Sequence, residues 1–268
     1  LAPKRGNGKM ALLQVENLSV QFGGLKALND VSLQVDTGDF VGLIGPNGAG
    51  KTTLFNAITG VVHASAGTIV FDGKSIKGMR PDKIALCGIS RTFQNIRLFP
   101  KMKVYENVEI GINRIAQYNM LEAVLNTPRK RRLDRETHEH ALRYLEQVGI
   151  LQYKDSYAGE LPYGIQRRLE IARAISTQPK ILFLDEPAAG MNNDETRDLI
   201  NFLRALHKQT GLAIILIEHH LEVVMELCRD ITVLNLGAML AHGTPEEIQN
   251  DSAVIKAYIG ERRNKFHA

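Results

Sequence analysis

A glycine-rich segment that ends in a lysine and two threonines offers the chemistry of phosphate binding. Residues 45–53 match the pattern GxxxxGK[ST], with an apolar run before them and a helical sequence after them. Glycines in this pattern let backbone N–H groups point at phosphate oxygens, and the following helix adds its positive end. An ordinary glycine-rich turn is the alternative interpretation, but such a turn rarely has these flanks. The residues predicted to bind a nucleoside triphosphate are Gly45, Pro46, Asn47, Gly48, Ala49, Gly50, Lys51, Thr52 and Thr53.

Three side chains of this segment have separate expected roles. We expect Lys51 to reach the β and γ phosphates, where its charge would serve catalysis as well as binding. The hydroxyl of Thr52 should ligate Mg²⁺, and Thr53 should add a further phosphate contact. The segment therefore predicts a site for a nucleoside triphosphate, ATP, together with its magnesium ion.

Two adjacent carboxylates follow the apolar run at 181–184. Residues 45–53 are called the phosphate loop below. We expect Asp185 to bind Mg²⁺, directly or through water, beside this loop. Glu186 is placed to orient or deprotonate an attacking water. Such a pair can also merely end a strand in solvent, but its coincidence with a phosphate loop favours the functional interpretation. His219 and His220 follow another apolar run, and one of them could hydrogen-bond the γ phosphate.

The elements expected around these residues belong to the α/β class. Apolar runs at 40–44, 181–184 and 213–217 suit strands that are buried on both faces. The stretch 199–206 has apolar residues at helical spacing, and 135–149 shows a weaker form of the same pattern. Strands that alternate with helices predict a parallel sheet with helices packed on it.

Antiparallel β structure is expected near both ends of the chain. Residues 12–35 alternate apolar and polar side chains, with a glycine pair at the middle. The stretch 68–71 is typical of a strand followed by a turn, and 231–242 of a hairpin around Gly237. The expected sheet is therefore mixed, and it is accompanied by an antiparallel β region.

Composition excludes several classes of protein. The chain has 268 residues, of which 44% are hydrophobic and 23% charged, as in globular proteins. It contains no apolar run long enough to span a bilayer and no apolar stretch of signal-peptide type near its beginning. Cys87 and Cys228 form no metal-binding or redox motif, so we expect them to be reduced thiols. Tryptophan is absent and aromatic residues make up 6%, which disfavours base stacking and a nucleic-acid partner.

The net charge of +4 comes from limited parts of the chain. Residues 1–10 carry three basic and no acidic side chains, and residues 261–268 carry three basic and one acidic. The run 129–135 carries five basic and one acidic, and a solvated helix face is the favoured interpretation over a membrane or partner patch. The remainder is acidic overall, so the basic charge does not predict a polyanion partner other than a nucleotide.

With these motifs in order, the chain resembles the nucleotide-binding subunits of ATP-binding cassette transporters over nearly its full length. The resemblance implies that Phe22 stacks on adenine, and that Gln94 contacts Mg²⁺ and the attacking water and senses the membrane subunit. It makes His219 the switch histidine and gives Asp185 and Glu186 the roles already expected. It places the signature sequence, which contacts the nucleotide of a second cassette, at residues 161–165, with contacts from Tyr163 and Gly164.

Three departures from the family pattern stand out. The signature usually reads Leu-Ser-Gly-Gly-Gln, and here Pro162, Tyr163 and Ile165 replace three of its residues. Because proline offers neither a hydroxyl nor an N–H, any phosphate contact should come from the backbone near Tyr163 and Gly164. Asn192 stands where the loop that pairs across the dimer usually has aspartate, and His220 stands where aspartate commonly follows the switch histidine.

The signature and its continuation look like those of cassettes that serve branched-chain amino acid importers. The long insert and the segment from Gly243 onward fit the same group. Cassettes of urea importers and of lipopolysaccharide exporters share much of this pattern and stay as alternatives. A non-transport ATPase that acts on nucleic acid is less favoured, because the chain holds one cassette and no long coiled coil. A purely regulatory nucleotide-binding module is disfavoured by Glu186.

The resemblance also implies an organisation and a set of partners. Residues 10–95 and 165–260 would form a P-loop NTPase core with its antiparallel β region, and 96–164 an inserted helical subdomain with the signature. Residues 1–9 would be a tail, with Met10 a plausible natural start, and 261–268 a basic C-terminal tail. The expected partners are membrane permease subunits and a second cassette, the same or a related chain, and indirectly a solute-binding protein. The expected location is peripheral, at the cytoplasmic face of the inner membrane.

Overall fold

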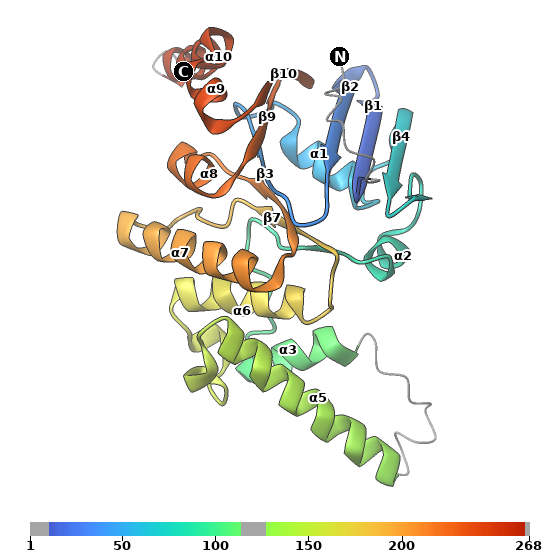
Figure 1. Cartoon of the computed structure of the whole chain (residues 1–268), viewed down its shortest axis with the longest axis vertical. Coiled ribbons are helices and arrows are strands. Elements are labelled where there is room, and N and C mark those ends of the chain that lie inside the picture. The colour runs from blue at the N-terminus through green and yellow to red at the C-terminus, as the bar shows by residue number, and fades with distance from the viewer. Residues whose placement is uncertain (1–10, 114–126, 266–268) are drawn as a thin grey trace.

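The computed structural model describes residues 11–113 and 127–265 (Figure 1). They form two β-sheets and a set of helices whose bounds are as follows: β1 Leu13–Phe22, β2 Leu25–Val35, β3 Phe40–Ile44, α1 Lys51–Ile58, β4 Ala66–Phe71, β5 Lys74–Ser75, α2 Pro81–Leu86, β6 Ile89–Arg91, α3 Val104–Asn113, α5 Pro128–Gln147, α6 Tyr163–Ile175, β7 Ile181–Asp185, α7 Asn193–Thr210, β8 Ala213–Ile217, α8 Leu221–Leu227, β9 Asp230–Asn235, β10 Ala238–Gly243, α9 Pro245–Asn250 and α10 Ser252–Lys265. Two short 3₁₀ turns, Leu151–Tyr153 and Ala158–Glu160, precede α6.

The larger sheet has the strand order β10-β9-β3-β8-β7-β6. Its strands pair in parallel except β9 and β10, which form the expected antiparallel hairpin. Strands β3, β7 and β8 are buried along their whole length because helices and the second sheet cover the two faces. Alternate residues of β7 therefore enter opposite cores, Leu182 on the helical side and Phe183 on the side of the second sheet.

The smaller sheet is antiparallel, with the order β2-β1-β4-β5. Strands β1 and β2 pair closely along most of their length, as the alternation over 12–35 predicts. The inner face of this sheet, helix α1 and one face of the large sheet form one hydrophobic core, to which β3 contributes Val41 and Leu43. This arrangement confirms the α/β class predicted from the sequence, with a mixed sheet and an antiparallel β region.

Helices α3 and α5 lie at the end of the molecule opposite the antiparallel sheet and pack against α6 (Figure 1). Helix α5 begins at Pro128, seven residues earlier than the sequence pattern predicts, because Thr127 caps it by accepting the N–H of Lys130. The basic run 129–135 is therefore helical. Lys130 pairs with Asp134 at 2.6 Å, one turn along the exposed surface, in keeping with a solvated face.

Both cysteines are free thiols. Cys228 is buried, and this burial raises the pKa of its thiol above the ordinary value. Within the described residues, no helix is both long and apolar enough to cross a membrane.

Candidate functional site

The phosphate loop connects the buried strand β3 to helix α1, which begins at Lys51. Gly45 and Gly50 have φ angles of 148° and 102°, in the region that side-chain-bearing residues rarely adopt. A Cβ atom at Gly45 would lie 2.1 Å from the carbonyl oxygen of Leu234, so no larger residue fits there. The first turn of α1 contains no acidic residue, and its N-terminal field is therefore available to an anion.

Lys51 folds back over the loop that precedes it. Its Nζ donates to the carbonyl oxygens of Gly45 and Pro46 at 2.7 and 2.9 Å, and the residue is only 5% exposed. A buried ammonium needs such partners, since an unpaired charge would be expensive to desolvate. The contacts hold the only basic side chain of residues 45–53 at the loop itself.

A hollow of about 600 Å³ opens over the loop. It gathers most of the predicted nucleotide site, namely Phe22, Asn47, Gly48, Ala49, Gly50, Lys51, Thr52, Thr53, Glu186 and His219. It is also lined by residues that sequence reasoning missed, Leu25, Lys26, Ala27, Leu236 and Gly237. Leu236 lies in the hairpin turn between β9 and β10. The only signal in the sequence for this residue is its position before Gly237. Phe22 is half-exposed at the end of β1, so its ring is accessible.

Glu186 is held between two other predicted residues. Its Oε2 accepts a 2.6 Å hydrogen bond from Nε2 of Gln94, and its Oε1 lies 2.5 Å from Nε2 of His219. Its φ angle is 48°, a strained value for a residue with a side chain, and its N–H donates to the carbonyl of Ile217. Strain of this kind persists where the surroundings fix the backbone, often at functional sites. The carboxylate is thus oriented beside the phosphate loop.

Asp185 ends strand β7 and is almost fully buried. Its Oδ2 pairs with Nη2 of Arg91 at 2.6 Å, and both side chains are less than a tenth exposed. The other terminal guanidinium nitrogen of Arg91, Nη1, donates to the side chain of Asn56 in α1 at 2.6 Å. Arg91 was not singled out from the sequence. A charged residue at the end of a three-residue strand is common at surfaces, and only strand pairing brings it to Asp185.

Glu218 is a second buried carboxylate near the site that sequence reasoning left without a role. It accepts N–H groups from Ala188 at 2.7 Å and from His219 at 3.1 Å. Burial raises the pKa of Glu218, and the hydrogen bonds from Ala188 and His219 oppose that rise. The side chain therefore ties the loop after β7 to the loop after β8, which carries His219.

The predicted signature residues do not line the hollow. Tyr163 begins α6 and is 41% exposed, and its hydroxyl donates to the carbonyl of Ala189 at 3.1 Å. Gly164 follows it, and a Cβ atom at this position would meet no neighbouring element within 4 Å. Asn192, the unusual residue of the dimer loop, caps α7 by accepting the N–H of Glu195 in a capping box. Tyr163 and Asn192 thus have partners within one chain that the family pattern alone does not indicate.

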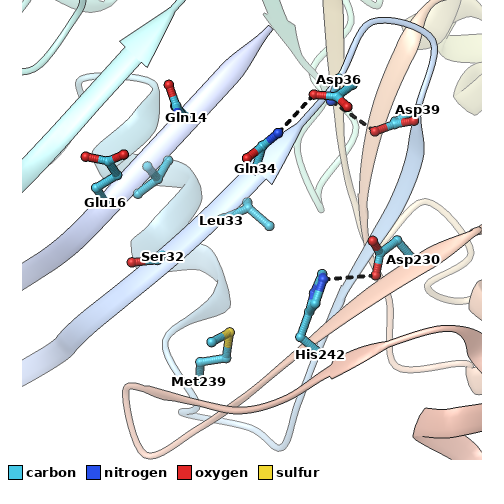
Figure 2. Close-up of a pocket in the computed structure, with 11 residues that line it drawn as sticks. Gln14, Glu16, Ser32, Leu33, Gln34, Asp36, Asp39, Asp230, Met239 and His242 are labelled. Carbon is cyan, nitrogen blue, oxygen red and sulfur yellow. Dashed lines mark hydrogen bonds and ion pairs between the residues drawn. The ribbon is translucent and has the colours of Figure 1, made fainter. Parts of the chain in front are cut away.

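A second, smaller cavity of about 100 Å³ lies between the antiparallel sheet and the hairpin of β9 and β10 (Figure 2). His242 points at Asp230 there, with Nε2 at 3.3 Å from Oδ1, and Asp39 accepts the backbone N–H of Asp36. The cavity shares no lining residue with the hollow over the phosphate loop. The carboxylates of Asp36, Asp39 and Asp230 have partners within the protein, and the cavity lies at a seam between two sheets, apart from the hollow over the phosphate loop.

Comparison with known proteins adds to this geometry. The family described as "ABC transporter" matches residues 28–189, and the one described as "Branched-chain amino acid ATP-binding cassette transporter" matches residues 238–263. The chain is 47% identical to the high-affinity branched-chain amino acid transport ATP-binding protein BraF of Pseudomonas aeruginosa, over 93% of this chain and 98% of that protein. It is 34% identical to the lipopolysaccharide export system ATP-binding protein LptB of Haemophilus influenzae, over 94% and 99%. Its fold is similar to the crystal structure of an ATP-binding cassette in its ADP conformation, with a TM-score of 0.81, 33% identity, and 94% and 100% coverage.

Proposed function

Because the chain belongs to the ABC transporter family, we propose that it is the ATP-hydrolysing subunit of a branched-chain amino acid importer. The observation that carries hydrolysis is the contact of Glu186 with Gln94 and His219 beside the phosphate loop. In this role Glu186 is the base that orients and deprotonates the attacking water. His219 hydrogen-bonds the γ phosphate, and Phe22 stacks on the adenine.

The phosphate loop supplies binding and charge stabilisation. Its backbone N–H groups and the first turn of α1 take the phosphate oxygens. Lys51 exchanges its carbonyl partners, Gly45 and Pro46, for the β and γ phosphates when the nucleotide binds. The buried Lys51 charge would thus have polar partners both without the nucleotide and with it.

The donor set fits a magnesium ion that arrives with the nucleotide. No group of three or more His, Cys, Asp or Glu side chains in the described ranges could hold a metal by itself. Magnesium commonly binds through one or two protein oxygens and the phosphates of a nucleotide. The Thr52 hydroxyl, the Asp185 carboxylate and the Gln94 side chain are the oxygens that would hold it. The ion would neutralise charge that develops on the phosphates.

The importer assignment rests on similarity to a named relative. Identity to BraF is 47%, against 34% to LptB, and the C-terminal family match concerns branched-chain amino acid transporters. We therefore favour this function over the export of lipopolysaccharide or the uptake of urea. The subunit would act at the cytoplasmic face of the membrane, with separate permease subunits that receive solute from a binding protein.

We also propose that two cassettes work as a pair, with the signature of one against the nucleotide of the other. Tyr163 and Gly164 lie away from the hollow of their own chain, which leaves their backbone N–H groups for a second nucleotide. ATP would then favour the closed pair, because its contacts are completed only there. The second cassette is the same or a related chain.

The function is tested by solute uptake in cells of the source organism that lack this gene. Restoring the wild-type gene should restore uptake of labelled leucine, isoleucine and valine, whereas Lys51→Ala should not. Urea uptake and lipopolysaccharide export serve as the comparison. Normal leucine uptake in the deletion strain, together with a defect in urea uptake or in lipopolysaccharide export, would show that the subunit serves that process and not branched-chain amino acid uptake.

A further inference from the structure

A ring of hydrogen bonds joins the first turn of α6 to Glu186 by two routes. It runs from the hydroxyl of Tyr163 through Arg167 and Gln94 to Glu186, and back through Ala189 to Tyr163. Its members lie in three separate segments, α6 and the loops after β6 and β7. The side-chain hydroxyl of Tyr163, at a position where the family signature usually has glycine, closes this ring.

The first route passes through a fully buried arginine. Arg167 donates to the carbonyl of Gln94 at 2.9 Å from the same nitrogen that contacts the Tyr163 hydroxyl at 3.2 Å. Its other terminal nitrogen donates to the carbonyl of Phe93 and to Glu170. The guanidinium is planar and rigid, so these bonds fix the backbone at residues 93–94. The side chain of Gln94 then donates to Glu186.

The second route passes through the loop after β7. Tyr163 donates its hydroxyl proton to the carbonyl of Ala189, and the N–H of Ala189 donates to the carbonyl of Glu186 at 3.1 Å. This turn contains the strained φ of Glu186. The hydroxyl of Tyr163 thus restrains Glu186 from its backbone side, while Gln94 restrains the carboxylate.

We propose that Tyr163 is a positioning residue for Glu186, acting through its hydroxyl on both Gln94 and Ala189. The proposal rests on Glu186 being the base of the proposed function. The Tyr163 hydroxyl would thus position Glu186, which is separate from the proposed contact of the Tyr163 backbone with a second nucleotide. Since both Tyr163 and Arg167 belong to the signature helix, a displacement of α6 reaches Glu186 through the Tyr163 hydroxyl and Ala189 and through Arg167 and Gln94.

Tyr163→Phe tests the proposal because it keeps the ring and the backbone and removes only the hydroxyl. We expect kcat for ATP hydrolysis to fall about tenfold, since small misplacements of a catalytic group are costly, while KM changes by less than about twofold. Amide hydrogen exchange at residues 93–97 and 188–190 of the nucleotide-free protein should become faster. Tyr157→Phe is the matched control, because Tyr157 is similarly exposed at 49% and lies outside the ring.

A double-mutant cycle separates positioning from general stability. If Tyr163 acts through Gln94, the loss in kcat for Tyr163→Phe with Gln94→Ala should be smaller than the product of the two single losses. A wild-type kcat in Tyr163→Phe, or losses that multiply, would overturn the proposal. A wild-type protein without ATPase activity would instead overturn the function on which it rests.

Discussion

The side-chain amide of Gln94 donates a 2.6 Å hydrogen bond to the carboxylate of Glu186, across 92 positions of sequence. The other carboxylate oxygen lies 2.5 Å from His219, so each oxygen is held by a different loop. A side chain restrained at both oxygens has few alternative orientations. The Glu186 carboxylate is therefore held in one orientation, as the proposed role of a base acting on water requires.

Replacing Glu186 by glutamine should separate binding from hydrolysis. The amide keeps the size of the side chain but cannot take a proton, so hydrolysis should fall by about 10²- to 10⁴-fold. ATP binding should persist, and an ATP-bound dimer should accumulate in size-exclusion chromatography. Glu139→Gln, on the exposed face of α5, is the control. Hydrolysis at the wild-type rate in Glu186→Gln would remove the residue from the role of base.

Replacing Lys51 by alanine should abolish turnover. The transferred phosphate would lose its main cationic side chain, and the rate should fall by at least about 100-fold. Affinity for a fluorescent ATP analogue should fall as well, which distinguishes this variant from Glu186→Gln. Lys208→Ala, at an exposed position of α7, should retain both properties. Normal turnover in Lys51→Ala would contradict the phosphate-loop assignment.

Replacing Arg91 by alanine should destabilise the fold through Asp185. It leaves a buried carboxylate without its cation, a change that typically costs about 3–5 kcal/mol of unfolding free energy. The exposed pair of Arg80 and Asp82 gives the matched control, because Arg80→Ala should cost less than about 1 kcal/mol. Urea unfolding of both variants measures the difference. Equal stabilities would show that burial of the Arg91 pair has no energetic consequence.

Glu218 should give the wild-type protein a pH-dependent stability that Glu218→Gln lacks. Its raised pKa means that the folded state binds the proton more tightly than the unfolded state does. Wild-type stability should therefore decrease, relative to the variant, as pH rises from the ordinary glutamate value of 4.5 through the raised pKa. Unfolding free energies measured from about pH 4.5 to about pH 8 test this. Parallel profiles for the two proteins would contradict it.

Much of the architecture could be predicted because its signals are local. The buried strands are short apolar runs, and the glycine loop is a contiguous motif whose φ angles only glycine adopts readily. The start of α5 was harder to predict. Its first turns carry a basic run without an apolar face, and the cap at Thr127 decides where the helix begins.

The candidate site was predictable in its motifs but not in its contacts. Arg91 contacts Asp185 because β6 pairs with β7. Glu218 contacts Ala188 because β8 pairs with β7. The residue types of Arg91 and Glu218 alone are equally typical of solvent-exposed positions. The sequence pattern indicated Glu186, the resemblance to a family indicated Gln94 and His219, and only the tertiary structure showed that both contact the Glu186 carboxylate.

The sequence by itself determined that this chain has a phosphate loop and an acidic strand end, since both depend on neighbouring residues and their backbone preferences. Only the tertiary structure decided which side chains restrain Glu186 and what the tyrosine of the altered signature contacts. Hydrogen bonds act over about 3 Å, and the distances between loops far apart in sequence are set by sheet register and core packing. For that reason, the identity of Tyr163 was visible in the sequence, but its connection to Glu186 was not.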